Sequence, residues 1–197
     1  MLHRDPSRRT FLQLSGAAGL GAWMTLSLAG CKDAAESASE ALRSGEGPRV
    51  LEEGERNTLE AFSDRILPPE GGQPGAVAMG AVVFMDHFLA DQPDQLRAAR
   101  DAMTTLDDKA READPEAAGF VQLEPEAQDA LLDHLSESDP QAVFPLWTLV
   151  MFGVLADPSH GGNRDKAGWA MIDFDDRHAW QPPFGYYDAQ ARQGGEA

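Results

Sequence analysis

The sequence is poor in cysteine and in positive charge. Cys31 is the single cysteine among 197 residues, so neither an intrachain disulfide nor a cysteine-based zinc site can form. Lys and Arg number 16 against 33 Asp and Glu, which gives a formal net charge of −17. This balance argues against binding to nucleic acid, whose phosphates need Lys and Arg, and against electrostatic binding to anionic lipid. The 42% of hydrophobic residues still allows a packed core.

The common signatures of catalysis are missing as well. No G-x-S-x-G elbow, P-loop or dinucleotide-binding fingerprint follows an expected strand. Four histidines follow the first thirty residues, and none forms an HxxxH or HExxH pair: His87, His134, His160 and His178. A local metal motif is therefore absent. A cluster of Asp157, His160 and His178 assembled by the fold is the remaining metal hypothesis, and it is weaker than a structural or solvated role for these histidines.

Residues 1–30 have the pattern of an export signal. Ser7 to Gln13 reads SRRTFLQ, and the uncharged stretch from Leu14 to Gly30 follows it. A positive segment before an apolar one is typical of secretory signals. The residues that match the twin-arginine (Tat) consensus are Arg8, Arg9, Phe11 and Leu12. We therefore expect export by the Tat translocase, a route that carries folded cargo.

The end of this signal resembles a bacterial lipoprotein box. The sequence Leu-Ala-Gly precedes Cys31, which would be lipidated and become the mature N-terminus. Two or more acyl chains anchor a protein stably, so the expected location is the periplasmic face of a membrane. A signal that is cut elsewhere or retained is the alternative. Residues 31–50 are small, polar and rich in Gly and Ser, which predicts a flexible tether.

The remainder predicts an all-α fold, a compact bundle of about five to six helices over residues 51–178, followed by an irregular tail at 179–197. Apolar residues recur at helical spacing, and no strand pattern occurs. The expected helices are 51–67, 76–90, 95–113, 125–135, 139–156 and 166–172. The helix at 139–156 is apolar almost all round, which is typical of a bundle core or of a helix buried against a partner. Pro145 should kink this helix or delay its start. Phe120 and Val121 are expected to tuck onto the core.

The stretch 155–174, LADPSHGGNRDKAGWAMIDF, is the densest in special residues. Gly161 and Gly162 permit positive φ or close backbone approach. Asn163 or Asp165 is expected to cap the short helix that follows, with Trp169 and either Met171 or Ile172 packed back. We expect Arg164 to brace the turn against Asp157, Asp165 or helix-end carbonyls. These features predict a rigid corner between two helices.

Taken together, these residues resemble the gluconate 2-dehydrogenase subunit 3 family. The resemblance lies in His160-Gly161-Gly162-Asn163-Arg164-Asp165, in Gly168-Trp169, and in the earlier segments Ile66 to Pro69 and Pro74 to Ala76. It implies a small non-catalytic subunit that has no cofactor of its own. The partner would be a large FAD-containing dehydrogenase of the glucose-methanol-choline (GMC) class that oxidises a sugar or polyol, often together with a cytochrome c subunit.

The resemblance further implies that the small subunit carries the Tat signal for the large one and supports its maturation. The eight residues from His160 to Asp165, Gly168 and Trp169 then become candidate partner contacts. The lipoprotein box departs from the usual family pattern and indicates that this subunit also anchors the complex. Two other hypotheses stay open: a free-standing acidic periplasmic lipoprotein of helical-bundle type, and an enzyme with a site near His160, Asn163 and Arg164.

Overall fold

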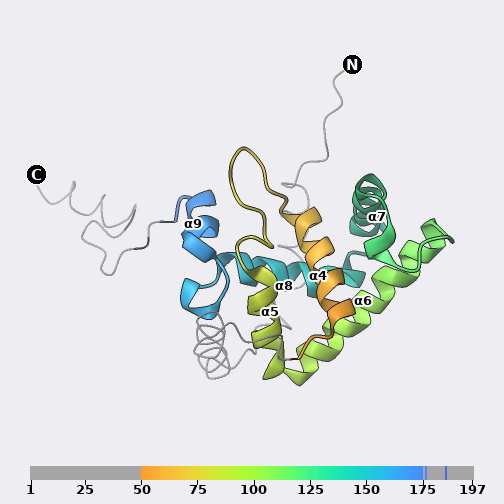
Figure 1. The fold of residues 1–197 in the computed structure, drawn as a ribbon, viewed down its shortest axis with the longest axis horizontal. Helices are drawn as coiled ribbons and strands as arrows, with labels where there is room; N and C mark the ends of the chain where they lie inside the picture. The colour runs from red at the N-terminus through yellow and green to blue at the C-terminus, as the bar shows by residue number, and fades with distance from the viewer. Residues whose placement is uncertain (1–49, 175, 177–184, 186–197) are drawn as a thin grey trace, which may run out of the picture.

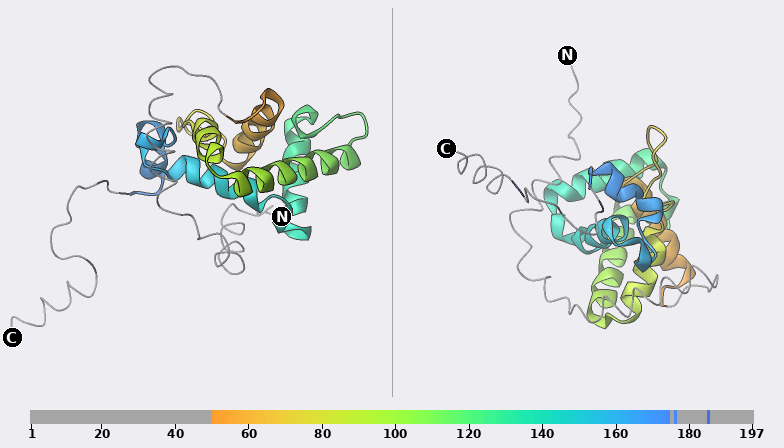
Figure 2. Two further views of the ribbon diagram at one scale, coloured as in Figure 1. Left: turned by 90° about the horizontal axis from the view of Figure 1, so that it is seen from below. Right: turned by 90° about the vertical axis from the view of Figure 1, so that its left-hand side faces the viewer.

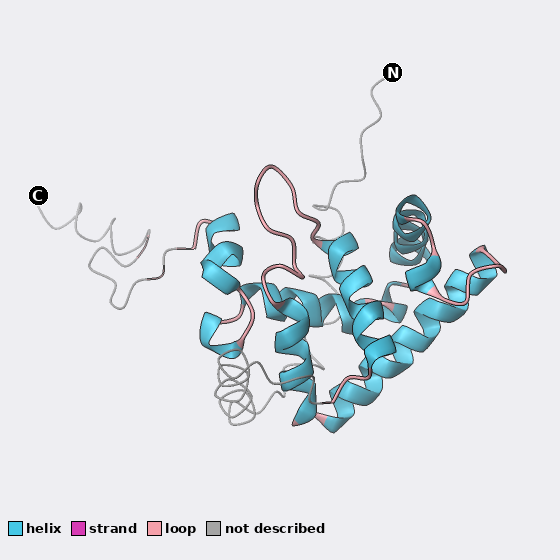
Figure 3. Ribbon diagram, in the orientation of Figure 1, coloured by secondary structure: helices cyan, strands magenta, loops and turns pink. Residues whose placement is uncertain are grey.

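The computed structural model describes residues 50–174, 176 and 185 of the chain. The predicted Tat signal with Arg8, Arg9, Phe11 and Leu12, the predicted lipidation site Cys31, and most of the tether and tail lie outside these residues. The described chain folds into helices and loops without a strand (Figure 1, Figure 3), which confirms the all-α prediction. The α-helices are α4 (Glu53–Ile66), α5 (Ala81–Ala90), α6 (Pro93–Ala113), α7 (Pro125–Ser138), α8 (Phe144–Leu155) and α9 (Ala167–Met171). The short 3-10 helices are η1 (Phe120–Gln122), η2 (Pro140–Ala142), η3 (Pro158–His160) and η4 (Arg164–Lys166).

Helix α8 is the centre of the bundle. It packs against α4, α5, α6 and α9, and its sequence contains no charged residue. The buried residues of α8 recur every three or four positions: Leu146, Leu149, Val150, Gly153 and Val154. A Cβ atom added at Gly153 would lie 2.8 Å from the Cα of Ala81, so α5 crosses α8 at very short range. Of the two alternatives for this apolar helix, the structure shows the bundle core, although Phe152 is 39% exposed.

The start of α5 differs from the prediction. The sequence pattern predicts a helix from Ala76, but residues 76–80 form turns and α5 begins at Ala81. Gly80 has a φ of 83°, in the left-handed region that ends or precedes a helix. A Cβ atom at Gly80 would lie 2.5 Å from the carbonyl oxygen of Gly161. The turn at 76–80 therefore packs directly against the segment that follows α8, and a residue larger than glycine at position 80 would collide with it.

Two other expectations need correction. The helix predicted from Asp139 is interrupted, because residues 140–142 form η2 and α8 begins only at Phe144. Pro145 accounts for the late start, since a proline ring fits the first turn of a helix but not its interior. Phe120 is fully buried as expected, whereas Val121 is 43% exposed. The 3-10 turn of η1 directs only one of these two neighbours inward.

Helices α9 and α7 lie at opposite ends of the described body (Figure 1). Helix α9 lies at one end of the long axis, and α7 lies at the other end beside the C-terminal half of α6 (Figure 1, Figure 2). None of the described helices is long and apolar enough to cross a membrane. The motif-bearing stretch 155–174 therefore occupies one end of an elongated helical body.

Candidate functional site: the corner between α8 and α9

Glycines allow the corner to press against the last turn of α8. A Cβ atom at Gly162 would lie 2.0 Å from the carbonyl oxygen of Gly153, and one at Gly168 would lie 2.0 Å from that of Val154. Side-chain carbon atoms do not approach backbone oxygens this closely without a shift of the chain. The predicted role of Gly162, close backbone approach, is therefore confirmed. Gly161 has a φ of 90° and fulfils the other prediction, positive φ.

Asn163 links the end of one helix to the start of the next. Its side chain is fully buried. The Nδ2 amide donates to the carbonyl oxygen of Ala156 at 2.9 Å, just past the end of α8. The Oδ1 atom accepts from the backbone N–H of Gly168 at 2.8 Å and, more weakly, from that of Trp169 at 3.4 Å, in the first turn of α9. Asn163 thus supplies the first-turn hydrogen bonds of a cap, as predicted, although the N-cap position of α9 is Lys166, and one amide serves both helix ends.

Further hydrogen bonds complete the end of α8. The backbone N–H of Asn163 donates to the carbonyl oxygen of Gly153 at 2.9 Å. The indole Nε1 of Trp169 donates to the carbonyl oxygen of Leu155 at 2.8 Å. Backbone acceptors at a helix C-terminus have no partner within the helix. The corner supplies those partners, so α8 and the corner form one structural unit.

Arg164 fastens this unit to a segment far away in the sequence. Its backbone N–H donates to the carbonyl oxygen of Met79 at 3.0 Å, and its Nη1 atom contacts that of Ala78 at 3.3 Å. The expected bracing of the turn by Arg164 is therefore present, but the acceptors belong to the turns at 76–80 and not to Asp157 or Asp165. The motif at 160–165 thus contacts the turns that directly follow the motif segment Pro74 to Ala76.

The backbone of the corner is strained. Among the described residues, positive φ occurs at four residues other than glycine: Asn163, Asp165 and Lys166 lie in the corner, and Asp173 follows α9. Such conformations cost of order 1–3 kcal/mol each and persist where the surroundings hold them, often at functional sites. Asp165 has a φ of 58° and does not act as the cap. The clustering marks this corner as the part of the described fold that keeps an unfavourable backbone shape.

The corner ends in an exposed apolar surface. Met171, Ile172 and Phe174 are 43%, 58% and 49% exposed, so the expectation that Met171 or Ile172 packs back is wrong. Helix α9 has five residues and buries only Gly168, which leaves its distal end facing outward. The ring of Phe174 lies 5.1 Å from that of Trp169, tilted by 56°.

Charged side chains flank this surface. Lys166 Nζ lies 2.5 Å from Asp176 Oδ2 and 5.9 Å from the centre of the Trp169 ring. The ion pair with Asp176 raises the pKa of Lys166. On the other side of the corner, hydrogen bonds from Ser159 lower the pKa of Asp157. Both groups therefore keep their charge over a wide range of pH.

The described residues of the corner are not arranged as the alternative hypotheses of catalysis and metal binding would require. The amide of Asn163 is used at both of its polar atoms, and Arg164 contacts backbone oxygens. His160 is half-buried in η3, whereas His178 lies outside the described residues. Within the described part of the chain, no three His, Cys, Asp or Glu residues are grouped to hold a metal ion.

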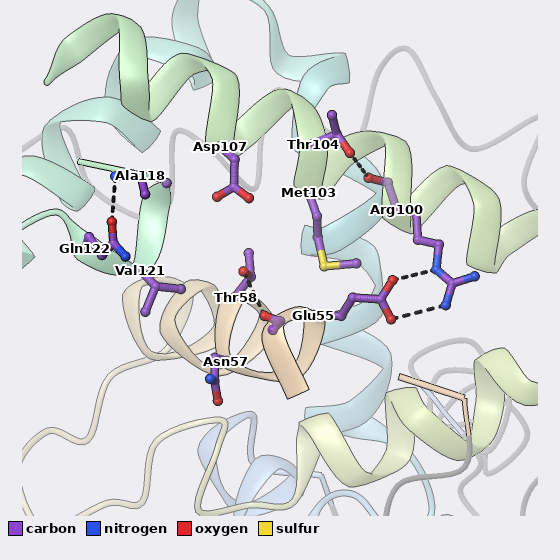
Figure 4. A pocket seen from close by; sticks show the side chains of 12 residues that line it. Glu55, Asn57, Thr58, Arg100, Met103, Thr104, Asp107, Ala118, Val121 and Gln122 are labelled. Atoms are coloured by element: carbon purple, nitrogen blue, oxygen red, sulfur yellow. Dashed lines mark hydrogen bonds and ion pairs between the residues drawn. The ribbon is translucent and has the colours of Figure 1, made fainter. Parts of the chain in front are cut away.

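A groove of about 530 Å³, lined by both polar and apolar side chains, lies between α4, α6 and η1 (Figure 4). Glu55 and Arg100 form a two-point ion pair at one end, with distances of 2.5 Å and 3.2 Å. Burial alone would raise the pKa of Glu55, but hydrogen bonds from Arg100 and from the backbone of Glu52 outweigh it and lower the pKa. Asp107 accepts from the backbone N–H of Phe120 at 2.9 Å and so fixes η1. The polar groups of the groove thus join helices to one another.

Sequence reasoning missed a buried carboxylate on α5. Asp86 is 2% exposed, and its Oδ1 atom accepts from the backbone N–H groups of Val50 and Leu51 at 2.9 Å each. Its Oδ2 atom pairs with Arg56 at 3.0 Å. Asp86 is the only acidic residue in α5, a helix in which His87 is the one other polar side chain. That isolation was the available signal, because a carboxylate on a buried helix needs partners.

Comparison with known proteins places this geometry in a family. The family described as gluconate 2-dehydrogenase subunit 3 matches residues 53–176. The matched span contains every helix from α4 to α9, together with the corner and the turns at 76–80 that it contacts. No curated protein and no solved structure shows a significant match to the chain.

Proposed function

Because the chain belongs to the gluconate 2-dehydrogenase subunit 3 family, we propose that it is the non-catalytic accessory subunit of a periplasmic FAD-dependent dehydrogenase. In this proposal the catalytic partner is a flavoprotein of the GMC class that oxidises a sugar or polyol. The FAD belongs to that partner, and a cytochrome c subunit is a further candidate member. The small subunit carries the complex through the Tat translocase and holds it at the membrane through Cys31.

The family match over the whole helical body is the observation that carries this proposal. A match that spans α4 to α9 concerns the entire described fold and not a short motif. The family name itself refers to one subunit of a dehydrogenase of several subunits. The sequence of the leader supports the carrier role, because Arg8 and Arg9 stand before an uncharged segment as in Tat signals.

The contacts of the corner support a structural role within such a complex. The polar atoms of Asn163 hold two helix ends, and Arg164 holds the turns at 76–80. A general base or a nucleophile would have to reach a substrate, and these groups face backbone atoms of their own chain. The corner therefore suits a protein that presents a fixed surface to a neighbour.

The carrier role is tested by changing both Arg8 and Arg9 to Lys in the cells that make the protein. This double change keeps the charge but removes the arginine pair, and Arg4→Lys serves as the matched control outside the motif. We expect the double variant to leave this chain and a flavin-containing dehydrogenase in the cytoplasm, while the control exports both. Export of the dehydrogenase at the normal level in the double variant would contradict the carrier role.

The subunit role is tested by purifying the tagged wild-type chain from detergent-solubilised membranes. We expect visible flavin absorbance and dye-linked oxidation of gluconate or glucose in the purified material. The flavin should be in a second polypeptide that denaturing electrophoresis resolves from this chain. Purification of the chain without flavin and without this activity would refute the proposed function.

A further inference from the structure

We propose that Met171, Ile172 and Phe174, here called the exit patch, form the surface on which the catalytic flavoprotein subunit docks. The inference rests on the proposed function and says which surface of this chain would contact the catalytic subunit. The partner surface would be an apolar recess.

The first argument is the exposure of the patch. Five large hydrophobic side chains are clearly exposed among the described residues, and three of the five make up the exit patch. Single exposed apolar residues are ordinary, but grouped ones mark interaction surfaces. Ile172 is the most exposed of the five at 58%. A residue of this kind suits a hot spot, where a few apolar anchors supply most of the binding free energy.

The second argument is that the patch is held rigidly. Asn163, Gly162 and Gly168 bind the preceding corner to α8, and Phe174 packs on Trp169. The backbone N–H of Phe174 also donates to the carbonyl oxygen of Trp169 at 2.9 Å. A surface that is already ordered loses little conformational entropy when a partner binds. The strained φ values of the corner therefore have a use, which is to keep the patch in one position.

The third argument is the charge near the patch. Over the described residues that follow Arg111, the only Lys or Arg residues are Arg164 and Lys166, and both lie in the corner before the patch. Lys166 is paired with Asp176 and Arg164 contacts backbone oxygens, while Asp165 and Asp173 lie in the same segment, so the surroundings of the patch follow the acidic balance of the chain. The chain as a whole has a net charge of −17. Two copies of so acidic a chain repel each other, and this favours a different protein as the occupant.

The experiment compares two substitutions of similar residues in the tagged full chain, produced in its own cells. Ile172→Asp places a charge in the exit patch, and Val121→Asp places the same charge at another exposed apolar residue, 43% exposed on η1. The flavin recovered per mole of chain and the dye-linked oxidation of gluconate or glucose are measured for both. We expect Ile172→Asp to lower both by at least about tenfold, the effect of 1.4 kcal/mol at an interface anchor. Val121→Asp should match the wild type, and Ile172→Leu should retain binding.

Each other outcome has its own consequence. Wild-type flavin recovery in Ile172→Asp, or an equal loss in Val121→Asp, overturns the docking surface and leaves the proposed function intact. If Ile172→Asp instead converts a dimer of this chain into a monomer and keeps the flavin, the patch joins two copies and the proposal is wrong. If the wild-type chain itself brings down no flavin, the proposed function and the inference fall together. Melting curves that match the wild type show that the variants are folded.

Discussion

Replacing Asn163 with Ala should lower the free energy of unfolding by more than the loss of a surface side chain would. The wild-type side chain is fully buried and joins the C-terminal end of α8 to the first turn of α9 through Ala156 and Gly168. Alanine removes these two hydrogen bonds and the weaker one from the backbone N–H of Trp169. It also leaves a carbonyl oxygen and an N–H group without a partner in a place that water reaches poorly.

The magnitude follows from these two groups and from the backbone. A buried polar group left without its hydrogen bond costs about 1–3 kcal/mol, and two such groups are created. Asn163 has a φ of 44°, a region in which Asn is tolerated better than Ala. Allowing for partial relaxation, we expect a loss of about 3–5 kcal/mol in the free energy of unfolding. At about 2–4 °C per kcal/mol for a chain of this size, Tm should fall by about 10 °C.

The assay is urea and thermal unfolding followed by far-UV circular dichroism. Asn57→Ala is the matched control, because Asn57 is exposed on α4 and its loss should change stability by less than about 0.5 kcal/mol. Asn163→Gly separates the two causes, since glycine relieves the left-handed backbone but restores none of the hydrogen bonds. A change below about 1 kcal/mol for Asn163→Ala would refute the reasoning that one amide holds both helix ends. Full rescue by glycine would show that backbone strain alone is responsible.

Two further predictions concern the corner glycines and the groove. Gly162→Ala should lower the free energy of unfolding in urea by at least about 3 kcal/mol, because its Cβ atom would overlap the carbonyl oxygen of Gly153. The control is Gly54→Ala on α4, whose Cβ atom would meet nothing within 4 Å; it should be neutral or stabilising by up to about 1 kcal/mol. Equal effects of the two changes would contradict the close approach at Gly162. The lowered pKa of Glu55 means that its ion pair stabilises the fold above the ordinary value of 4.5 and that this share is lost as the pH falls through the folded-state pKa. Glu55→Gln should therefore lower Tm near neutral pH and much less in strong acid, and a Tm difference independent of pH would contradict the assignment.

Local features of the sequence predicted the elements well. The helical spacing of apolar residues over 51–67 predicted α4, and the apolar stretch at 139–156 predicted the central helix, because each pattern reflects burial within one element. Pro145 also predicted the late start of α8. The error at residues 76–80 has another origin. Gly80 has a positive φ, and the carbonyl oxygen of Gly161 lies 2.5 Å from where its Cβ atom would be; no local pattern contains that distant neighbour.

The sequence predicted that residues 155–174 form a turn with a cap, but it did not predict which residues Arg164 contacts. The glycines and Asn163 are recognisable as turn and cap residues on local grounds. The acceptors of Arg164 lie in the turns at 76–80, more than eighty positions earlier in the chain, and only the fold brings them together. The outward orientation of Met171 and Ile172 was missed for a similar reason. From sequence alone, an apolar residue in or beside a short helix is expected to be buried. The structure shows that nothing in the described body covers these two.

The hydrogen bonds of Asp86 determine how the body responds to a mechanical load. One carboxylate holds the backbone of Val50 and Leu51, and Arg100 reaches the carbonyl oxygen of Val50 from α6 at 3.4 Å. A pull along the chain from its N-terminal side is therefore passed at residue 50 to α5 and α6 simultaneously, and α4 is not peeled away alone. Several bonds loaded in parallel must break together. The body should therefore resist such a pull as one unit.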